Sequence, residues 1–183
     1  MRTPRRSRRS SARAVNPTTF FSQPESDRLW APWRNVYLSL PKAARRGCVF
    51  CDAKASRKDR ESLVIARYRY SFVLLNRYPY NPGHLMLAPY RHVGSCARLR
   101  AEEAAELFTG LQQMTALLEQ RLHPIGFNVG VNIGRVAGAG VLGHLHVHVV
   151  PRWVGDANFM PTVAKTRVMS DSLDALYARL RAD

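Results

Sequence analysis

A row of three histidines at alternate positions constrains this chain more than any other feature. Residues 143–153 read GHLHVHVVPRW, so single apolar residues separate His144, His146 and His148. Side chains alternate between the two faces of a β-strand, which places these imidazoles on one face, roughly 6.6 Å apart in successive pairs. A buried neutral imidazole needs partners for one donor and one acceptor nitrogen, so such a row predicts a functional site rather than a core. The residues alone leave open whether that site is a metal cage or carries covalent phosphoryl chemistry.

The remaining periodicity predicts an α+β fold. Apolar residues recur at three- and four-residue steps over 102–122, which indicates one long helix, and 170–181 indicates a short C-terminal helix. Alternating or β-branched segments indicate an antiparallel sheet of about five strands, from 63–75 (one or two strands), 84–89, 127–133 and 145–150. Pro151 is expected to stop the last strand, and 45–60 is expected to be a charged loop.

Charge divides the chain of 183 residues into two parts. The net charge is +15, and the first fifteen residues hold six arginines and no acid. We expect 1–27 to be a disordered Arg-rich tail and 28–183 to be a single domain. A tail of this kind leaves a second class of function open, that of a nucleic-acid-binding protein.

Composition also bears on the compartment. No apolar run approaches the ~20 residues of a membrane helix, and the basic N-terminal stretch lacks the apolar centre of a secretory signal. Three cysteines, an odd and low number, argue against a disulfide scaffold and favour a reducing, cytoplasmic compartment. Of these, Cys96 is expected to be a small buried apolar residue.

The histidine row resembles the signature of the histidine triad (HIT) nucleotide-binding family, in its fragile-histidine-triad branch. Further motifs resemble the bacterial diadenosine-tetraphosphate phosphorylases of that branch: LWAPWR at 29–34, CVFC at 48–51, NRYPYNPGHLMLAP at 76–89 and PRWVGDANFMP at 151–161. The resemblance covers about 29–168. It implies a HIT-like fold, a homodimer or higher homo-oligomer, and a nucleotide substrate that reacts with phosphate.

The resemblance also implies a catalytic mechanism. His146 would attack the α-phosphorus of a nucleoside polyphosphate and form a nucleotidyl-histidine, while His148 positions the phosphate and His84 lies beside the triad. An imidazole is largely unprotonated above its pKa of ~6.5, which suits this role. The implied reaction is phosphorolysis of diadenosine tetraphosphate to ATP and ADP. Hydrolysis of dinucleoside polyphosphates or nucleoside phosphoramidates by the same intermediate, which releases AMP, is the alternative.

Substrate contacts follow from the same resemblance. Asn76 would hold the ribose, and Val49 and Phe50 would pack on the base. Backbone N–H groups of the glycine-rich segment 134–141 would bind phosphate, with Asn132 nearby. The predicted substrate contacts are therefore Val49, Phe50, Asn76, Asn132, Gly140, Val141 and Trp153. Trp153 has two interpretations: an aromatic residue of the core or of a subunit interface, or a stacking surface for a second nucleoside.

The spacing Cys48-x-x-Cys51 is typical of zinc ligands. The resemblance adds His92 and His144, which gives a closed set of two cysteines and two histidines and therefore a structural Zn²⁺ rather than a catalytic one. The alternative is a catalytic metal held by all three histidines of the row, whose activity a chelator would abolish. No organic cofactor is expected.

Overall fold

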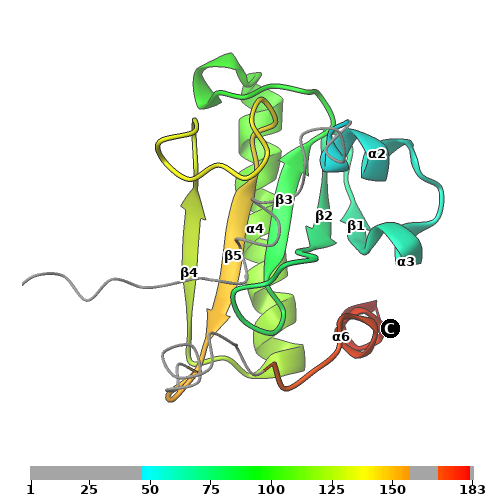
Figure 1. The fold of residues 1–183 in the computed structure, drawn as a ribbon, viewed down its shortest axis with the longest axis vertical. Coiled ribbons are helices and arrows are strands. Elements are labelled where there is room, and N and C mark those ends of the chain that lie inside the picture. The colour runs from blue at the N-terminus through cyan, green and yellow to red at the C-terminus, as the bar shows by residue number, and fades with distance from the viewer. Residues whose placement is uncertain (1–46, 157–168, 182–183) are drawn as a thin grey trace, which may run out of the picture. The chain divides into compact units, whose positions relative to one another are not determined.

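The computed structural model describes residues 47–156 and 169–181. They form a five-stranded antiparallel sheet with helices packed on both of its faces (Figure 1). The predicted α+β fold is confirmed. The predicted tail and the motif at 29–34 lie outside the described residues, as do the last residues of the motif at 151–161.

The sheet has the strand order β1-β2-β3-β5-β4. Its strands are β1 (Val64–Arg67), β2 (Ser71–Leu75), β3 (Leu85–Pro89), β4 (Gly126–Val131) and β5 (Val147–Arg152). The helices are α2 (Val49–Ala55), α3 (Asp59–Ser62), the 3₁₀ turn η3 (Cys96–Arg98), α4 (Ala101–Leu122) and α6 (Leu173–Arg181). In the described residues no helix is long and apolar enough to cross a membrane.

Helix α4 has the boundaries that the sequence predicts to within one residue. At its start the buried carboxylate of Glu103 accepts the Arg100 N–H at 2.8 Å, which satisfies a donor that the helix cannot. At its end His123 adopts a left-handed conformation (φ 51°), and Pro124 follows. The 22-residue helix crosses the sheet behind β3 and β5 (Figure 1).

Alternation along the strands produces two separate cores. On one side, here called the α4 face, Leu85, Leu87 and Val149 pack against apolar residues of α4 and α6. On the other side, here called the α2 face, Met86 and Ala88 pack with buried residues of α2. Each buried strand therefore divides its side chains between the two faces.

The expectation of a loop over 45–60 is wrong, because the segment forms α2 and α3. Phe50 and Ala53, three residues apart, are the buried residues of α2 and anchor it on the sheet. Such a one-turn apolar stripe is too short to stand out among charged neighbours, so tertiary packing decides the conformation here.

The expected last strand is displaced by two residues. β5 begins at Val147 instead of Leu145, and it continues through Pro151 to Arg152. Proline is tolerated because β3 pairs with β5 only over 147–149, so beyond this point the missing N–H faces no strand. The opposite side of β5 pairs with β4 throughout.

Cys96 is exposed, which overturns the expectation that it is buried. It begins the turn η3 at the surface, outside both cores. Burial statistics for cysteine as a residue type do not decide a position in a short surface turn.

Candidate active site

The histidine row lies on the α2 face of the sheet. His148 is opposite Met86 in the ladder between β3 and β5, and paired side chains project to the same face. The His146 ring lies 4.8 Å from the His148 ring, and the Phe50 ring contacts both His146 and His144. His144 and His146 precede β5, yet they extend the same row. The predicted placement on one face is confirmed.

His84 enters the site from the turn before β3. Gly83 has φ +75°, and a Cβ there would lie 2.5 Å from the Leu122 side chain, so glycine allows the turn to sit against α4. The His84 ring is fully buried and stacks on Tyr80 at 4.8 Å. Its Nε2 lies 2.9 Å from Nδ1 of His148. The turn therefore adds a fourth histidine to the site.

Hydrogen bonds fix the tautomer of His84 and thereby that of His148. The Tyr80 backbone N–H donates to His84 Nδ1 at 3.1 Å, and the Asn76 amide nitrogen lies 3.3 Å from the same atom. Both groups can only donate, so Nδ1 is unprotonated and Nε2 carries the proton. His84 then donates to His148 Nδ1, which leaves the remaining proton of a neutral His148 on its Nε2. His148 thus presents a donor.

His146 is held in the complementary state. Its Nδ1 lies 2.9 Å from the backbone oxygen of His144, and a carbonyl can only accept, so Nδ1 carries the proton. The lone pair is on Nε2. Burial lowers the pKa of His146, although its bond to the carbonyl opposes the shift, so the ring is neutral around pH 7. His146 thus has an available nucleophilic nitrogen.

His144 faces away from this pair toward two cysteines. Its Nε2–H donates to the Pro89 oxygen at 2.8 Å, which leaves the lone pair on Nδ1. That atom lies 3.3 Å from the sulfur of Cys48 and 3.6 Å from the sulfur of Cys51. Burial lowers the pKa of His144, so its ring is also neutral and able to bind a metal.

The four predicted metal ligands form one cluster. His92 Nδ1 lies 3.2 Å from the sulfur of Cys51, and the ligand atoms of Cys48, Cys51, His92 and His144 all lie within 4.8 Å of one another. Two sulfur and two nitrogen atoms at this spacing suit a tetrahedral Zn²⁺. Because the backbone carbonyl of His144 also holds the His146 ring, one residue links the cluster to the centre of the row.

The predicted base-binding residues differ in exposure. Val49 is 46% exposed, whereas Phe50 is fully buried between the His144 and His146 rings. Only Val49 offers a free surface in this structure. Asn76 is half-buried, and its oxygen accepts the Tyr78 N–H at 2.9 Å while its nitrogen faces His84. The structure thus places Asn76 at the edge of the row.

The glycine-rich segment between β4 and β5 is mostly exposed. The N–H groups of Gly138 and Ala139 donate within the segment, to Arg135 and Gly134, so they are already occupied. Val141 packs against the core of the α2 face, which brings the end of the segment to that core. Gly140 and Asn132 are half-buried, and both remain predicted phosphate contacts.

Trp153 is not brought to the histidine row in the described chain. It follows β5 and packs against the α4-face core, and its Nε1–H donates to the His123 oxygen at 3.1 Å. A stacking role at the site would therefore need another subunit. Sequence reasoning missed three backbone groups: the Tyr80 N–H, the Pro89 carbonyl and the His144 carbonyl. The signal was the demand of each buried imidazole for a donor and an acceptor.

Comparison with known proteins decides the family. The model of the HIT domain matches residues 57–154, more than half of the chain. This protein belongs to the HIT family. The AP-4-A phosphorylase of Mycobacterium tuberculosis is 41% identical over 80% of this chain and 78% of its own. The asymmetrical bis(5'-nucleosyl)-tetraphosphatase of Schizosaccharomyces pombe is 33% identical over 52% of each chain.

Solved HIT structures have the same fold. A hypothetical histidine triad nucleotide-binding protein of Sulfolobus tokodaii is 26% identical, with a TM-score of 0.58 over 73% of this chain and 89% of its own. A Zn-bound histidine triad family protein of Mycobacterium smegmatis is 24% identical, with a TM-score of 0.59 over 74% of this chain and 91% of its own. The HIT-like fold expected from the sequence is thus confirmed.

Proposed function

We propose that this HIT protein cleaves dinucleoside polyphosphates by forming a nucleotidyl-histidine on His146 and passing the nucleotide to inorganic phosphate. One observation carries the proposal: Nε2 of His146 is unprotonated beside a His148 whose Nε2 bears a proton. Nucleophile and donor are fixed by separate hydrogen bonds, before any substrate arrives. The names of the two enzymes reported above support the substrate class.

In the first step, the Nε2 lone pair of His146 attacks the α-phosphorus of diadenosine tetraphosphate. A nitrogen–phosphorus bond forms, and the bond from that phosphorus to its bridging oxygen breaks. ATP leaves with the electron pair of the broken bond. The Nε2–H of His148 stabilises the charge that develops on the phosphoryl oxygens, and His84 holds this donor in place. His146 is left as a cationic adenylyl-histidine.

In the second step an oxygen of inorganic phosphate attacks the adenylyl phosphorus. The nitrogen–phosphorus bond breaks, its electrons return to His146, and ADP is released. Water in place of phosphate releases AMP. The phosphorolytic reaction is favoured because the relative with 41% identity is named a phosphorylase.

Product identification separates the two reactions. We expect purified protein given diadenosine tetraphosphate and phosphate to release ATP and ADP in equal amounts, with turnover that rises with phosphate concentration. Oxygen-18-labelled phosphate should place its label in ADP. Release of ATP and AMP at a rate that is independent of phosphate would establish the hydrolase instead.

The Cys/His cluster supports a structural Zn²⁺ held by Cys48, Cys51, His92 and His144. A closed set of this kind leaves no open coordination position, so the metal would supply rigidity and no catalytic step. This assignment also argues against a catalytic metal bound by all three histidines of the row. His146 and His148 are engaged with a carbonyl and with His84.

Strand β4 supports a homodimer. In the described sheet it is an edge strand, and its Val129 and Val131 side chains are 46% and 38% exposed. Exposed apolar edges are unfavourable in a monomer, and a second copy would cover this one. Sedimentation should give twice the chain mass.

A cytoplasmic location and nucleic-acid binding by residues 1–27 remain predictions. Cell fractionation and polynucleotide binding by a tail-deleted chain test them.

A further inference from the structure

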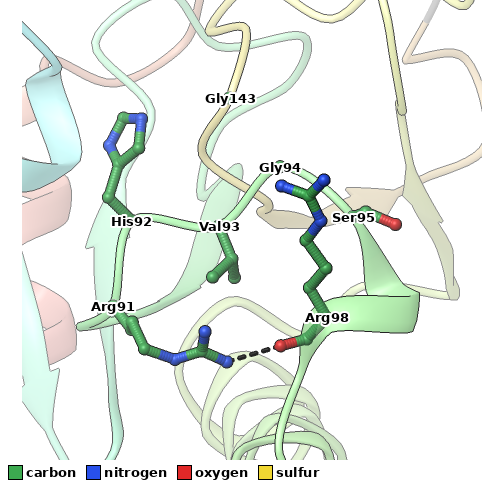
Figure 2. Close-up of a pocket in the computed structure, with 7 residues that line it drawn as sticks. All are labelled: Arg91, His92, Val93, Gly94, Ser95, Arg98 and Gly143. Atoms are coloured by element: carbon green, nitrogen blue, oxygen red, sulfur yellow. Dashed lines mark hydrogen bonds between the residues drawn. The ribbon is translucent and has the colours of Figure 1, made fainter.

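A cavity lies beside the Cys/His cluster, and His146 and His148 are not part of its lining. It has a volume of about 620 Å³ and lies between the loop that precedes α4 and Gly143 (Figure 2). Its lining consists of Arg91, His92, Val93, Gly94, Ser95, Arg98 and Gly143. Two of these side chains are guanidinium groups, and none is a carboxylate.

The two arginines of this cavity differ in what they can offer. Arg91 forms a two-point ion pair with Glu103, at 2.9 and 2.6 Å, so its charge is balanced. Its Nη2 also donates to the backbone oxygen of Arg98 at 2.5 Å, which ties η3 to this anchor. Arg98 itself is exposed, and within 47–156 and 169–181 its guanidinium has no ion-pair or hydrogen-bond partner. The cavity thus has one arginine, Arg91, held by an ion pair and a second, Arg98, whose charge is not paired with a carboxylate of the described residues.

The floor of the cavity is joined to the segment that carries the histidine row. A Cβ on Gly94 would lie 2.8 Å from the Cα of Gly143, so the two backbones touch at this point. The Leu145 N–H donates to the Val93 oxygen at 2.6 Å. Gly143 directly precedes His144. The cavity therefore borders the backbone that leads into the site.

We propose that this cavity, here called the Arg98 cavity, binds the phosphate group of a small anion at a site separate from the reacting histidines. A guanidinium fork matches the oxygens of a phosphate, and Arg98 has its donors free for such a contact. The choice of phosphate over a carboxylate rests on the proposed function, because the substrate, co-substrate and products of that reaction all carry phosphate. Two sources fit: orthophosphate, and a terminal phosphate of ATP.

Amide resonances can test the site without turnover. We expect the ¹⁵N–¹H signals of Gly94, Ser95 and Gly143 to shift on titration with orthophosphate or ATP in a His146→Asn protein, which lacks the nucleophile. In the same background Arg98→Gln should weaken this binding at least about 10-fold. The substitution leaves the anchor from Arg91 in place, because that bond uses the backbone of residue 98.

Arg57→Gln is the matched control, an exposed arginine that does not line the cavity, and it should leave the titration unchanged at equal ionic strength. If the shifts saturate at a lower concentration of ATP than of orthophosphate, the nucleotide is the source of the bound phosphate group. Saturation at an equal or lower concentration of orthophosphate assigns the free ion. Absence of the shifts with both anions, or equal shifts in Arg98→Gln, overturns the proposal. Failure of phosphorolysis would leave these shifts in place, so the two hypotheses fail separately.

Discussion

The two ends of the histidine row use the same residue type for different chemistry. At one end His144 donates from Nε2 to Pro89 and turns Nδ1 toward two sulfur atoms. At the other end His148 accepts at Nδ1 from His84 and keeps its proton on Nε2. The difference comes from the groups behind each ring. The partner of one ring nitrogen decides whether the other presents a lone pair or a proton.

The largest expected effect is at the centre of the row. His146→Ala should reduce turnover of diadenosine tetraphosphate at least about 10³-fold, because the covalent route loses its nucleophile. His123→Asn is the matched control, since His123 is an exposed histidine at the end of α4 and asparagine tolerates its left-handed conformation. Steady-state rates for both proteins check this. Near-parental activity of His146→Ala would remove the proposed mechanism.

The next effect is at the His148 end. His84→Asn should lower kcat about 10²-fold, because the shorter side chain no longer reaches His148 and the proton on His148 is free to move to Nδ1. His84→Gln should retain more activity, since its amide can donate from nearly the position of Nε2. Equal losses in the two variants would show that His84 acts by packing and not by fixing a tautomer.

The metal end should show the opposite pattern, with a large effect on structure and a small one on rate. Cys51→Ser should lower zinc content from about one ion per chain to a small fraction and reduce Tm, while kcat falls less than about 10-fold. Cys96→Ser, at an exposed cysteine outside the cluster, should change neither. Elemental analysis and thermal unfolding provide the readouts. Undiminished zinc in Cys51→Ser would contradict the assigned ligands.

The sequence predicts some features of the fold and of the site better than others. Alternation predicted the row and its face, and helical periodicity predicted α4, because both depend on patterns that extend over many residues. The two cysteines of the Cys/His cluster were predicted from their spacing, and its two histidines from a family resemblance. The tautomers could not be predicted, since they depend on the carbonyls of Pro89 and His144 and on the Tyr80 N–H. Such backbone groups are not specific to a sequence, because every residue has a carbonyl and every residue except proline has an N–H. The role of Trp153 stayed undecided, because a subunit interface and a second nucleoside both lie outside a single chain.

The smallest expected effect on activity is far from the row, at the start of α4. The hydrogen-bonded ion pair between Glu103 and Arg91 lowers the pKa of Glu103 from 4.5 to about 2. Burial opposes this shift, and the hydrogen bond from the Arg100 N–H adds to it. A lowered pKa stabilises the fold above about pH 4.5, and this contribution is lost as the pH falls toward 2. Glu103→Gln should reduce the free energy of unfolding by up to about 3 kcal/mol at pH 7 and leave kcat within about twofold.

Denaturant titration at pH 7 and pH 2.5 checks this prediction. The difference between parent and variant should shrink at the lower pH, because the carboxyl group of the unfolded parent chain is then protonated while that of the folded chain is still largely ionised. An equal difference at both values would mean that the ion pair does not carry the stability. Unchanged activity at pH 7 would show that the row functions independently of this anchor.

Mass analysis of the trapped intermediate is the most direct test of the central claim. Protein mixed with diadenosine tetraphosphate without phosphate, quenched in alkali and digested, should yield a peptide bearing one adenylyl group on His146. The label should disappear when phosphate is added before the quench, and it should be absent from His146→Gly. An adenylyl group on another residue, or turnover with no labelled peptide at any time, would contradict the account.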